Sequence, residues 1–168
     1  MARLTGKVAI VTGSSSGIGK AIALRYGAEG AKVVVTARRL ALCEQTVAQI
    51  VAQGGEARAI QTDVADEQQV ERLIAETVTR YGRLDVLVNN AAIVARGPIG
   101  AVTDDDLERV VTTNFTAQVR LIRAALPHLT DCLINIGSGA LYRPVPNSGV
   151  YIATKAADRK STRLNSSH

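Results

Sequence analysis

A tyrosine and a lysine, Tyr151 and Lys155, stand four residues apart in the apolar segment VYIATKAA (150–157). In a helix this spacing places both side chains on one face. A free tyrosine has a pKa of about 10, so it exchanges protons poorly at neutral pH, but a nearby ammonium group stabilises the phenolate. Lowering that pKa by about 3 units requires roughly 4 kcal/mol. The pair is therefore a candidate acid–base couple, although such pairs also arise by chance on helix surfaces.

The glycine-rich segment TGSSSGIG (12–19) separates a short apolar run from a segment of helical period. Gly13 permits a tight turn, Gly17 lets the backbone approach a pyrophosphate, and Gly19 allows close packing of helix on strand. The N–H groups and the positive dipole end of the helix would face the phosphates. Three glycines in this register exceed what a turn needs. The segment therefore predicts a dinucleotide site, although its G-x-x-x-G-x-G spacing differs from the common G-x-G-x-x-G.

Ser138 follows CLINIG (132–137), an apolar segment of strand length. Open α/β sheets bind ligands at the carboxyl ends of their strands, so this hydroxyl is placed to hydrogen-bond a substrate oxygen. Hydride transfer between a nicotinamide and a carbonyl requires a proton at the same oxygen, which Tyr151 could exchange. A serine, a tyrosine and a lysine in one chain with the glycine turn thus form a candidate site for such a reaction.

The elements that must position these residues follow a regular alternation. It predicts right-handed crossovers and a parallel sheet covered by helices on both faces, and the mostly apolar strands fit burial on both sides. The fold class is therefore a doubly wound, Rossmann-like α/β domain. Asp66 or a neighbour can cap the third helix, which Gly82 ends. The expected strands are 7–12, 31–36, 57–62, 84–89 and 132–137, and the expected helices before the tyrosine are 17–30, 40–55, 66–82 and 104–129.

Length and composition narrow the class of protein. A chain of 168 residues that is 46% hydrophobic is large and apolar enough to form one globular domain with a real core. No apolar run approaches the roughly 18 residues of a membrane span, so we expect a cytoplasmic protein. The net charge of +5 is scattered and not arranged in a basic stripe, which argues against a nucleic-acid partner. The two cysteines and two histidines lack metal-ligand spacing, so we expect reduced thiols and no metal.

Residues 4–157 together resemble the short-chain dehydrogenase/reductase family, in its simple, non-extended branch. TGSSSGIG is similar to the cofactor motif of that family, and TDV (62–64) to its adenine-binding motif. NNAA (89–92) resembles the N-N-A-G motif, with Ala92 in place of the usual glycine. Asn114 in TTNFTA matches the helical asparagine of the family, and Ser138, Tyr151 and Lys155 match its catalytic residues.

The resemblance implies a role for each matching residue. Asn114, Ser138, Tyr151 and Lys155 would be catalytic, with Asn114 holding a water that joins Lys155 to a proton relay. Lys155 would also bind the nicotinamide ribose, and Asp63 the adenine. The full-length form would be a homo-tetramer or dimer, with tetramers formed through the helices that begin near Asn114 and Tyr151. The implied cofactor-binding residues are Gly13, Ser15, Ser16, Gly17, Ile18, Gly19, Arg38, Asp63, Val64, Asn90, Ala91, Tyr151 and Lys155.

The end of the second predicted strand bears on which nicotinamide cofactor is bound. A carboxylate about 20 residues after the glycine motif binds the ribose diol of NAD in Rossmann-type folds. Here that position is Ala37, followed by Arg38 and Arg39. A carboxylate would repel a 2′-phosphate, whereas Arg38 can form charge-assisted hydrogen bonds to it. The sequence thus favours NADP(H) over NAD(H), and Arg39 is interpreted as a solvated residue at the helix start.

The substrate is less well defined. The segments 91–100 and 139–149 should line its pocket, where Arg96 or Arg143 would either meet an anionic group or remain solvated. A 3-oxoacyl thioester reductase and a sugar or polyol dehydrogenase both fit the motifs. One alternative is a non-catalytic dinucleotide-binding module, or an inactive fragment of the reductase. A nucleotide-sugar epimerase also uses Y-x-x-x-K, but usually with a different glycine spacing.

The final segment DRKSTRLNSSH (158–168) is basic, rich in hydroxyl groups and without periodicity. It corresponds in frame to the codons of a common sequencing adapter. In the family, the chain continues beyond the lysine helix with two more strands and a segment that covers the substrate. We therefore expect 1–157 to be a truncated, inactive NADP(H)-binding domain and 158–168 to be a non-native or disordered tail. The alternative is a genuine solvated tail.

Overall fold

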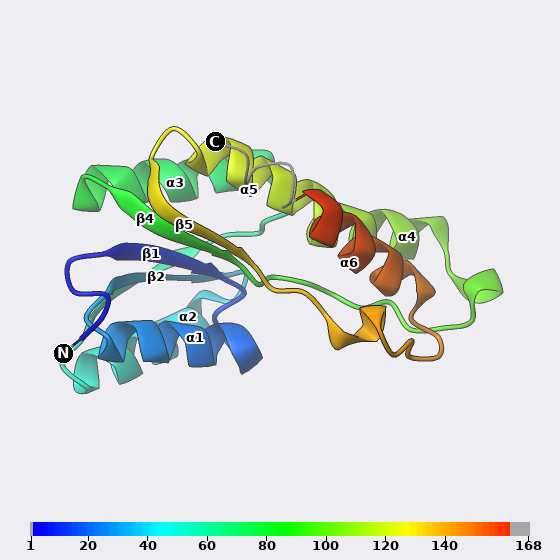
Figure 1. Ribbon diagram of the computed structural model, residues 1–168, viewed down its shortest axis with the longest axis horizontal. Coiled ribbons are helices and arrows are strands. Elements are labelled where there is room, and N and C mark those ends of the chain that lie inside the picture. The colour runs from blue at the N-terminus through cyan, green and yellow to red at the C-terminus, as the bar shows by residue number, and fades with distance from the viewer. Residues whose placement is uncertain (1, 162–168) are drawn as a thin grey trace.

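The computed structural model describes residues 2–161, in which strands and helices alternate along the chain (Figure 1). The strands are β1 (Val8–Thr12), β2 (Lys32–Ala37), β3 (Glu56–Gln61), β4 (Leu84–Asn89) and β5 (Leu129–Asn135). The α-helices are α1 (Gly17–Ala28), α2 (Leu40–Ala52), α3 (Glu67–Tyr81), α4 (Asp104–Val111), α5 (Ala117–Ala125) and α6 (Gly149–Ser161). Short 3₁₀ turns span Ile99–Ala101 and Gly139–Leu141, and a π-helical turn spans Thr112–Thr116.

The five strands form one parallel sheet in the order β3-β2-β1-β4-β5. Helices α1 and α2 cover one face, and α3 and α5 cover the other (Figure 1). Alternate residues of β1 point to opposite faces of the sheet and pack in two hydrophobic cores. Ile10 packs in the core with α3 and α5, whereas Ala9 and Val11 pack in the core with α1 and α2. The predicted doubly wound, Rossmann-like α/β fold is confirmed. The order reverses between β1 and β4, where such folds bind ligands.

The expected burial on both sides holds for the inner strands and does not hold for the two outer strands. Strands β1 and β4 are buried throughout, and β2 is buried except at its ends, whereas β3 and β5 are largely half-buried or exposed. The physical reason is strand order, which places β3 and β5 at the two edges of the described sheet. The fifth strand also begins at Leu129 rather than 132, because the polar residues Thr130 and Asp131 interrupt the apolar pattern at its start.

The predicted helix 104–129 is not one regular helix. It consists of α4, the π-helical turn and α5, and it ends at Ala125, shortly before Pro127. A π-helical turn inserts one extra residue into an α-helix and is often found at functional sites. At α3 the predicted signals are confirmed: Asp66 accepts a hydrogen bond from the Gln69 N–H, and Gly82 ends the helix with φ +72°.

The apolar segment 150–157 lies within α6, which continues to Ser161. Residues 158–161 of the predicted tail lie within α6, while residues 162–168 lie outside the described residues. A helix can continue through residues of any origin, so a non-native tail stays a prediction. Within residues 2–161, no helix is both long and apolar enough to cross a membrane.

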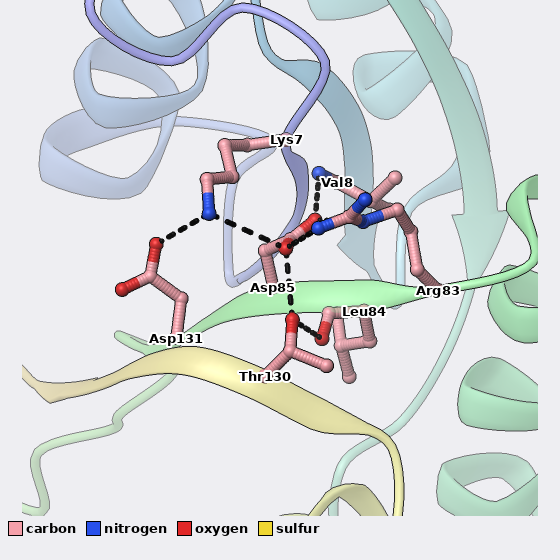
Figure 2. Close-up of polar contacts among 7 residues, drawn as sticks. All are labelled: Lys7, Val8, Arg83, Leu84, Asp85, Thr130 and Asp131. Carbon is pink, nitrogen blue, oxygen red and sulfur yellow. Dashed lines mark hydrogen bonds and ion pairs between the residues drawn. The ribbon is translucent and has the colours of Figure 1, made fainter.

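A buried carboxylate ties three strands together at the amino end of the sheet (Figure 2). Asp85 of β4 accepts hydrogen bonds from the Val8 N–H at 2.8 Å, from the Thr130 hydroxyl at 2.8 Å, and from two Arg83 nitrogens at 2.6 and 2.9 Å. Burial by itself would raise the pKa of Asp85, but these hydrogen bonds outweigh it and hold the pKa well below its usual range. The Lys7 ammonium nitrogen lies 3.6 Å from a carboxylate oxygen of Asp85 and 2.9 Å from one of Asp131.

Candidate active site

At two of the three glycine positions in the turn after β1, steric contacts leave no room for a side chain. A Cβ on Gly13 would lie 2.9 Å from the Ala91 Cα, and one on Gly19 would lie 2.6 Å from the Gly13 carbonyl oxygen. Gly17 has open space around it, but its φ of +56° lies in the left-handed region that favours glycine. The turn therefore brings the first turn of α1 against β1 and the segment after β4, leaving the backbone near Gly17 open.

Asn90 connects this turn to the end of β4. Its side-chain amide donates to the carbonyl oxygens of Thr12 at 2.9 Å and Gly13 at 3.3 Å. The Thr12 hydroxyl accepts from the N–H groups of Asn90 and Ala91 at 3.0 and 3.1 Å. Because the Asn90 side chain is engaged in these contacts, its main effect in this structure is to hold the glycine turn. The NNAA segment and the glycine turn thus form one rigid unit at the switch point of the sheet.

A cavity of about 780 Å³ opens at the carboxyl ends of β1 to β4. It gathers most of the predicted cofactor-binding residues from separate parts of the chain. Those lining it are Gly13, Ser15, Ser16, Ile18, Arg38, Asp63, Val64, Asn90 and Ala91. The other lining residues are Ala37, Arg39, Thr62, Ala65, Ala92, Ile93, Arg109 and Thr113. Of the remaining predicted contacts, Gly17 and Gly19 belong to the turn, while Tyr151 and Lys155 do not line this cavity.

The walls of the cavity carry more positive than negative charge. Arg38 and Arg39 line it just after β2, and Arg109 lines it from α4. Asp63 is the one acidic group among the described lining residues, and its carboxylate accepts a hydrogen bond from the Ala65 N–H at 3.0 Å. Arg109 is paired with Asp106, whereas neither Arg38 nor Arg39 forms an ion pair with a described side chain. The unpaired guanidinium groups make this wall suited to an anionic ligand.

Lys155 is buried, with 2% of its surface exposed, and its ammonium donates to the carbonyl oxygen of Ile136 at 2.7 Å. Burial lowers its pKa, and the charge of Asp158 partly opposes that shift. Tyr151 precedes it by four residues on α6 and is half-buried. Ser138 is also half-buried, and its hydroxyl accepts a hydrogen bond from the Ala140 N–H at 3.2 Å. The structure therefore brings Lys155 against the end of β5, two residues from Ser138.

Asn114 lies in the π-helical turn and is fully buried. Its amide donates to the Ile93 carbonyl at 2.9 Å and to the Thr154 hydroxyl at 3.2 Å, and its oxygen accepts from the Ile93 N–H at 2.8 Å. Asn114 thus joins the loop after β4 to the helix that carries Tyr151 and Lys155. Its predicted water-holding role stays a prediction, because the side chain in this structure contacts protein groups.

Comparison with known proteins agrees with this arrangement. A family model described as short chain dehydrogenase matches residues 7–166. The chain belongs to the short-chain dehydrogenase/reductase family. Versicolorin reductase 1 from Aspergillus parasiticus is 41% identical over 159 residues, which are 92% of this chain and 61% of that protein. An uncharacterized oxidoreductase from Methylorubrum extorquens is also 41% identical, over 94% of this chain and 64% of its own length.

Solved structures of short-chain dehydrogenases are similar over the same part of the chain. A dehydrogenase/reductase from Sinorhizobium meliloti has 42% identity and a TM-score of 0.88, covering 92% of this chain and 63% of its own. A short chain dehydrogenase from Burkholderia cenocepacia, in complex with NADP, has 39% identity and a TM-score of 0.88, covering 92% and 65%. The chain thus spans slightly less than two thirds of the length of these relatives.

Two residues of this short-chain dehydrogenase site were missed from the sequence. Thr12 holds the NNAA segment through its hydroxyl, and buried Ser14 donates to the Val11 carbonyl at 2.6 Å while accepting from the Thr36 N–H at 2.9 Å. A hydroxyl residue on either side of Gly13 was a visible signal, but only the folded chain shows which backbone groups these hydroxyls meet.

Proposed function

We propose that this chain carries the cofactor site of an oxidoreductase that transfers a hydride between NADP(H) and a carbonyl or secondary alcohol. The observation that carries the proposal is the end of β2, where Ala37 replaces a carboxylate and Arg38 lines the cavity without an ion pair to a described side chain. A guanidinium there can bind a 2′-phosphate in a charge-assisted fork. The NADP held by the relative from Burkholderia cenocepacia supports the same cofactor.

The chemistry proposed for the chain is a proton exchange beside the cofactor. NADPH, when bound, supplies the hydride. Tyr151 gives its phenol proton to the substrate oxygen, Ser138 hydrogen-bonds and positions that oxygen, and the Lys155 ammonium stabilises the resulting phenolate. Asn114 keeps α6 in place relative to the loop after β4 through its contacts with Thr154 and Ile93. A homo-oligomeric state and a cytoplasmic location stay predictions.

A second candidate is a non-catalytic dinucleotide-binding module. One observation favours it: neither Tyr151 nor Lys155 lines the cavity, and the Lys155 ammonium donates to a backbone carbonyl. This candidate predicts tight NADPH binding without turnover of any carbonyl compound. The oxidoreductase requires both NADPH binding and turnover.

Calorimetric titration of this chain with NADPH and NADH tests the cofactor assignment. We expect NADPH to bind at least tenfold more tightly, and Arg38→Asp to reverse the preference by adding an anion beside the 2′-phosphate. Arg80→Asp is the matched control, because Arg80 is exposed on α3 and does not line the cavity. Equal affinities of the unchanged chain for both cofactors would contradict the assignment.

A further inference from the structure

The Lys155 ammonium donates a hydrogen bond to the carbonyl group of Ile136 and also feels the charge of Asp158. The side chain is almost wholly buried, and its ammonium donates to the Ile136 oxygen at 2.7 Å. A buried ammonium is costly unless an acceptor replaces the water it has lost. Any shift of the Ile136 carbonyl would therefore weaken its hydrogen bond with this ammonium. The Ile136 carbonyl is thus the hydrogen-bond acceptor that holds the Lys155 ammonium at the end of β5.

Ile136 follows the last residue of β5, a strand with one partner in the described sheet. Its N–H donates to the Asn89 carbonyl oxygen at 2.9 Å, which is a rung of the β4–β5 ladder. Directly before it, Asn135 lies opposite Asn89 in the register, and the Asn135 side-chain oxygen accepts from the Asn89 side-chain amide at 2.9 Å. The two strands are therefore joined by a side-chain bridge as well as by backbone hydrogen bonds at the point where the Lys155 acceptor lies.

Burial makes this bridge decisive for Asn89. Asn89 is 1% exposed, and its side-chain oxygen has no hydrogen-bond partner among the described residues. The contact with Asn135 is thus the hydrogen bond that compensates the burial of its amide group. Asn135 also donates to Asp158 at 2.7 Å, in the segment predicted to be non-native, but the bridge itself needs only residues 89 to 155.

We propose that Asn89 and Asn135 are positioning residues for Lys155, acting through the carbonyl group of Ile136. The bridge holds the end of β5 against β4, and the carbonyl fixed in this way keeps the ammonium inside the protein. The catalytic meaning of this arrangement rests on the proposed function, whereas the placement of Lys155 does not. A measurement on the lysine itself therefore tests the inference separately from turnover.

Competitive labelling of amines with acetic anhydride, followed by mass spectrometry, gives the reactivity of each lysine in the 168-residue chain. Lys155 should react at least tenfold more slowly than Lys20, which is only half-buried on α1. Asn135→Leu should raise the Lys155 rate at least tenfold and leave the Lys20 rate unchanged. Asn89→Leu should do the same, and it should fold because an apolar group of similar shape removes the unpaired oxygen.

Two further variants separate positioning from stability. Thr130→Val lies on the same strand and removes the hydroxyl contact with Asp85, so it should lower the melting temperature without changing the Lys155 rate. Asn135→Asp keeps an oxygen acceptor for Asn89 but places a carboxylate against Asp158, so it is combined with Asp158→Asn, and this double variant should keep Lys155 protected. An unchanged Lys155 rate in the folded Asn135→Leu or Asn89→Leu chain would overturn the proposal, whatever the turnover of the enzyme. An increase of the same size with Thr130→Val would also overturn it, because general loosening of β5 would then be the cause.

Discussion

The two ends of the parallel sheet differ in whether the protein itself supplies partners for its charged side chains. At the amino end, the buried carboxylate of Asp85 accepts hydrogen bonds from Val8, Arg83 and Thr130 (Figure 2). At the carboxyl end, Arg38 and Arg39 line an open cavity and form no ion pair with a described side chain. The first arrangement is complete without a ligand, whereas the second leaves two cations to be neutralised.

The difference indicates what each end does. A buried charge whose hydrogen bonds are all supplied by the protein resists change, and removing one partner is costly because the others remain buried. Cations at the rim of a cavity instead attract an oppositely charged molecule, since their field extends into the space it would occupy. Changes at the amino end should therefore alter stability, and changes at the carboxyl end should alter binding and chemistry.

The largest effect is expected for Tyr151→Phe in an active protein that carries these residues. Loss of the phenol oxygen removes the proposed acid–base group, so kcat should fall by about 10²- to 10⁴-fold. The dissociation constant of NADPH and the melting temperature should change little, because the ring is retained. Steady-state kinetics and calorimetry measure these quantities. Tyr81→Phe, which alters a half-buried tyrosine of α3, is the control and should leave kcat unchanged. A kcat for Tyr151→Phe similar to that of the unchanged protein would refute the proposed role.

Asp85→Ala should destabilise the chain by about 3 kcal/mol, because it leaves the Val8 N–H and the Thr130 hydroxyl at the amino end without the acceptor they now have. Urea unfolding followed by circular dichroism measures the loss. The matched control is Asp131→Ala, whose side chain is 46% exposed and pairs with the same Lys7, and its cost should stay below about 1 kcal/mol. Similar costs for the two variants would mean that Asp85 is no more important than a surface ion pair.

Gly19→Ala should weaken NADPH binding by about tenfold, equivalent to about 1.4 kcal/mol. The new Cβ would press on the Gly13 carbonyl and on the Asn90 side chain, and so displace the turn that faces the cavity. Calorimetry measures the change, with Gly100→Ala as a control in open space and without a positive φ. Unaltered binding by Gly19→Ala would show that the turn tolerates a side chain at this position.

A smaller, graded effect is expected from acid. The pKa of Asp85 is lowered in the folded chain, so its contribution to stability is present above the pKa of the unfolded chain, about 3.9, and is lost as pH falls below that value. Asp85→Asn should flatten the decline of the urea midpoint between pH 5 and about pH 3. Hydrogen bonds from Arg3 lower the pKa of Glu29 to about 2, so Glu29→Gln is measured alongside. If Glu29→Gln removes the decline and Asp85→Asn does not, the acid sensitivity arises at Glu29 and not at Asp85.

Several features of the fold and site could be predicted because their signals are local. The glycine turn, the cap at Asp66 and the end of α3 at Gly82 depend on residues within a few positions of one another. The cofactor cavity was predictable in its membership, since parallel strands bring their carboxyl ends to one edge. The π-helical turn around Asn114 was not, because an apolar repeat does not show one inserted residue.

The sequence by itself determined the alternation of strands and helices, the glycine turn, the unopposed Arg38, and the Tyr151–Lys155 spacing on one helix. These follow from backbone preference and helical periodicity, which act over a few residues. Only the tertiary structure decided that β3 lies at the opposite edge of the sheet, that Asp85 meets Val8 and Thr130, and that Lys155 contacts Ile136. Those contacts join residues 19 to 77 positions apart, and such pairs are chosen by the packing of the whole sheet and not by any local pattern.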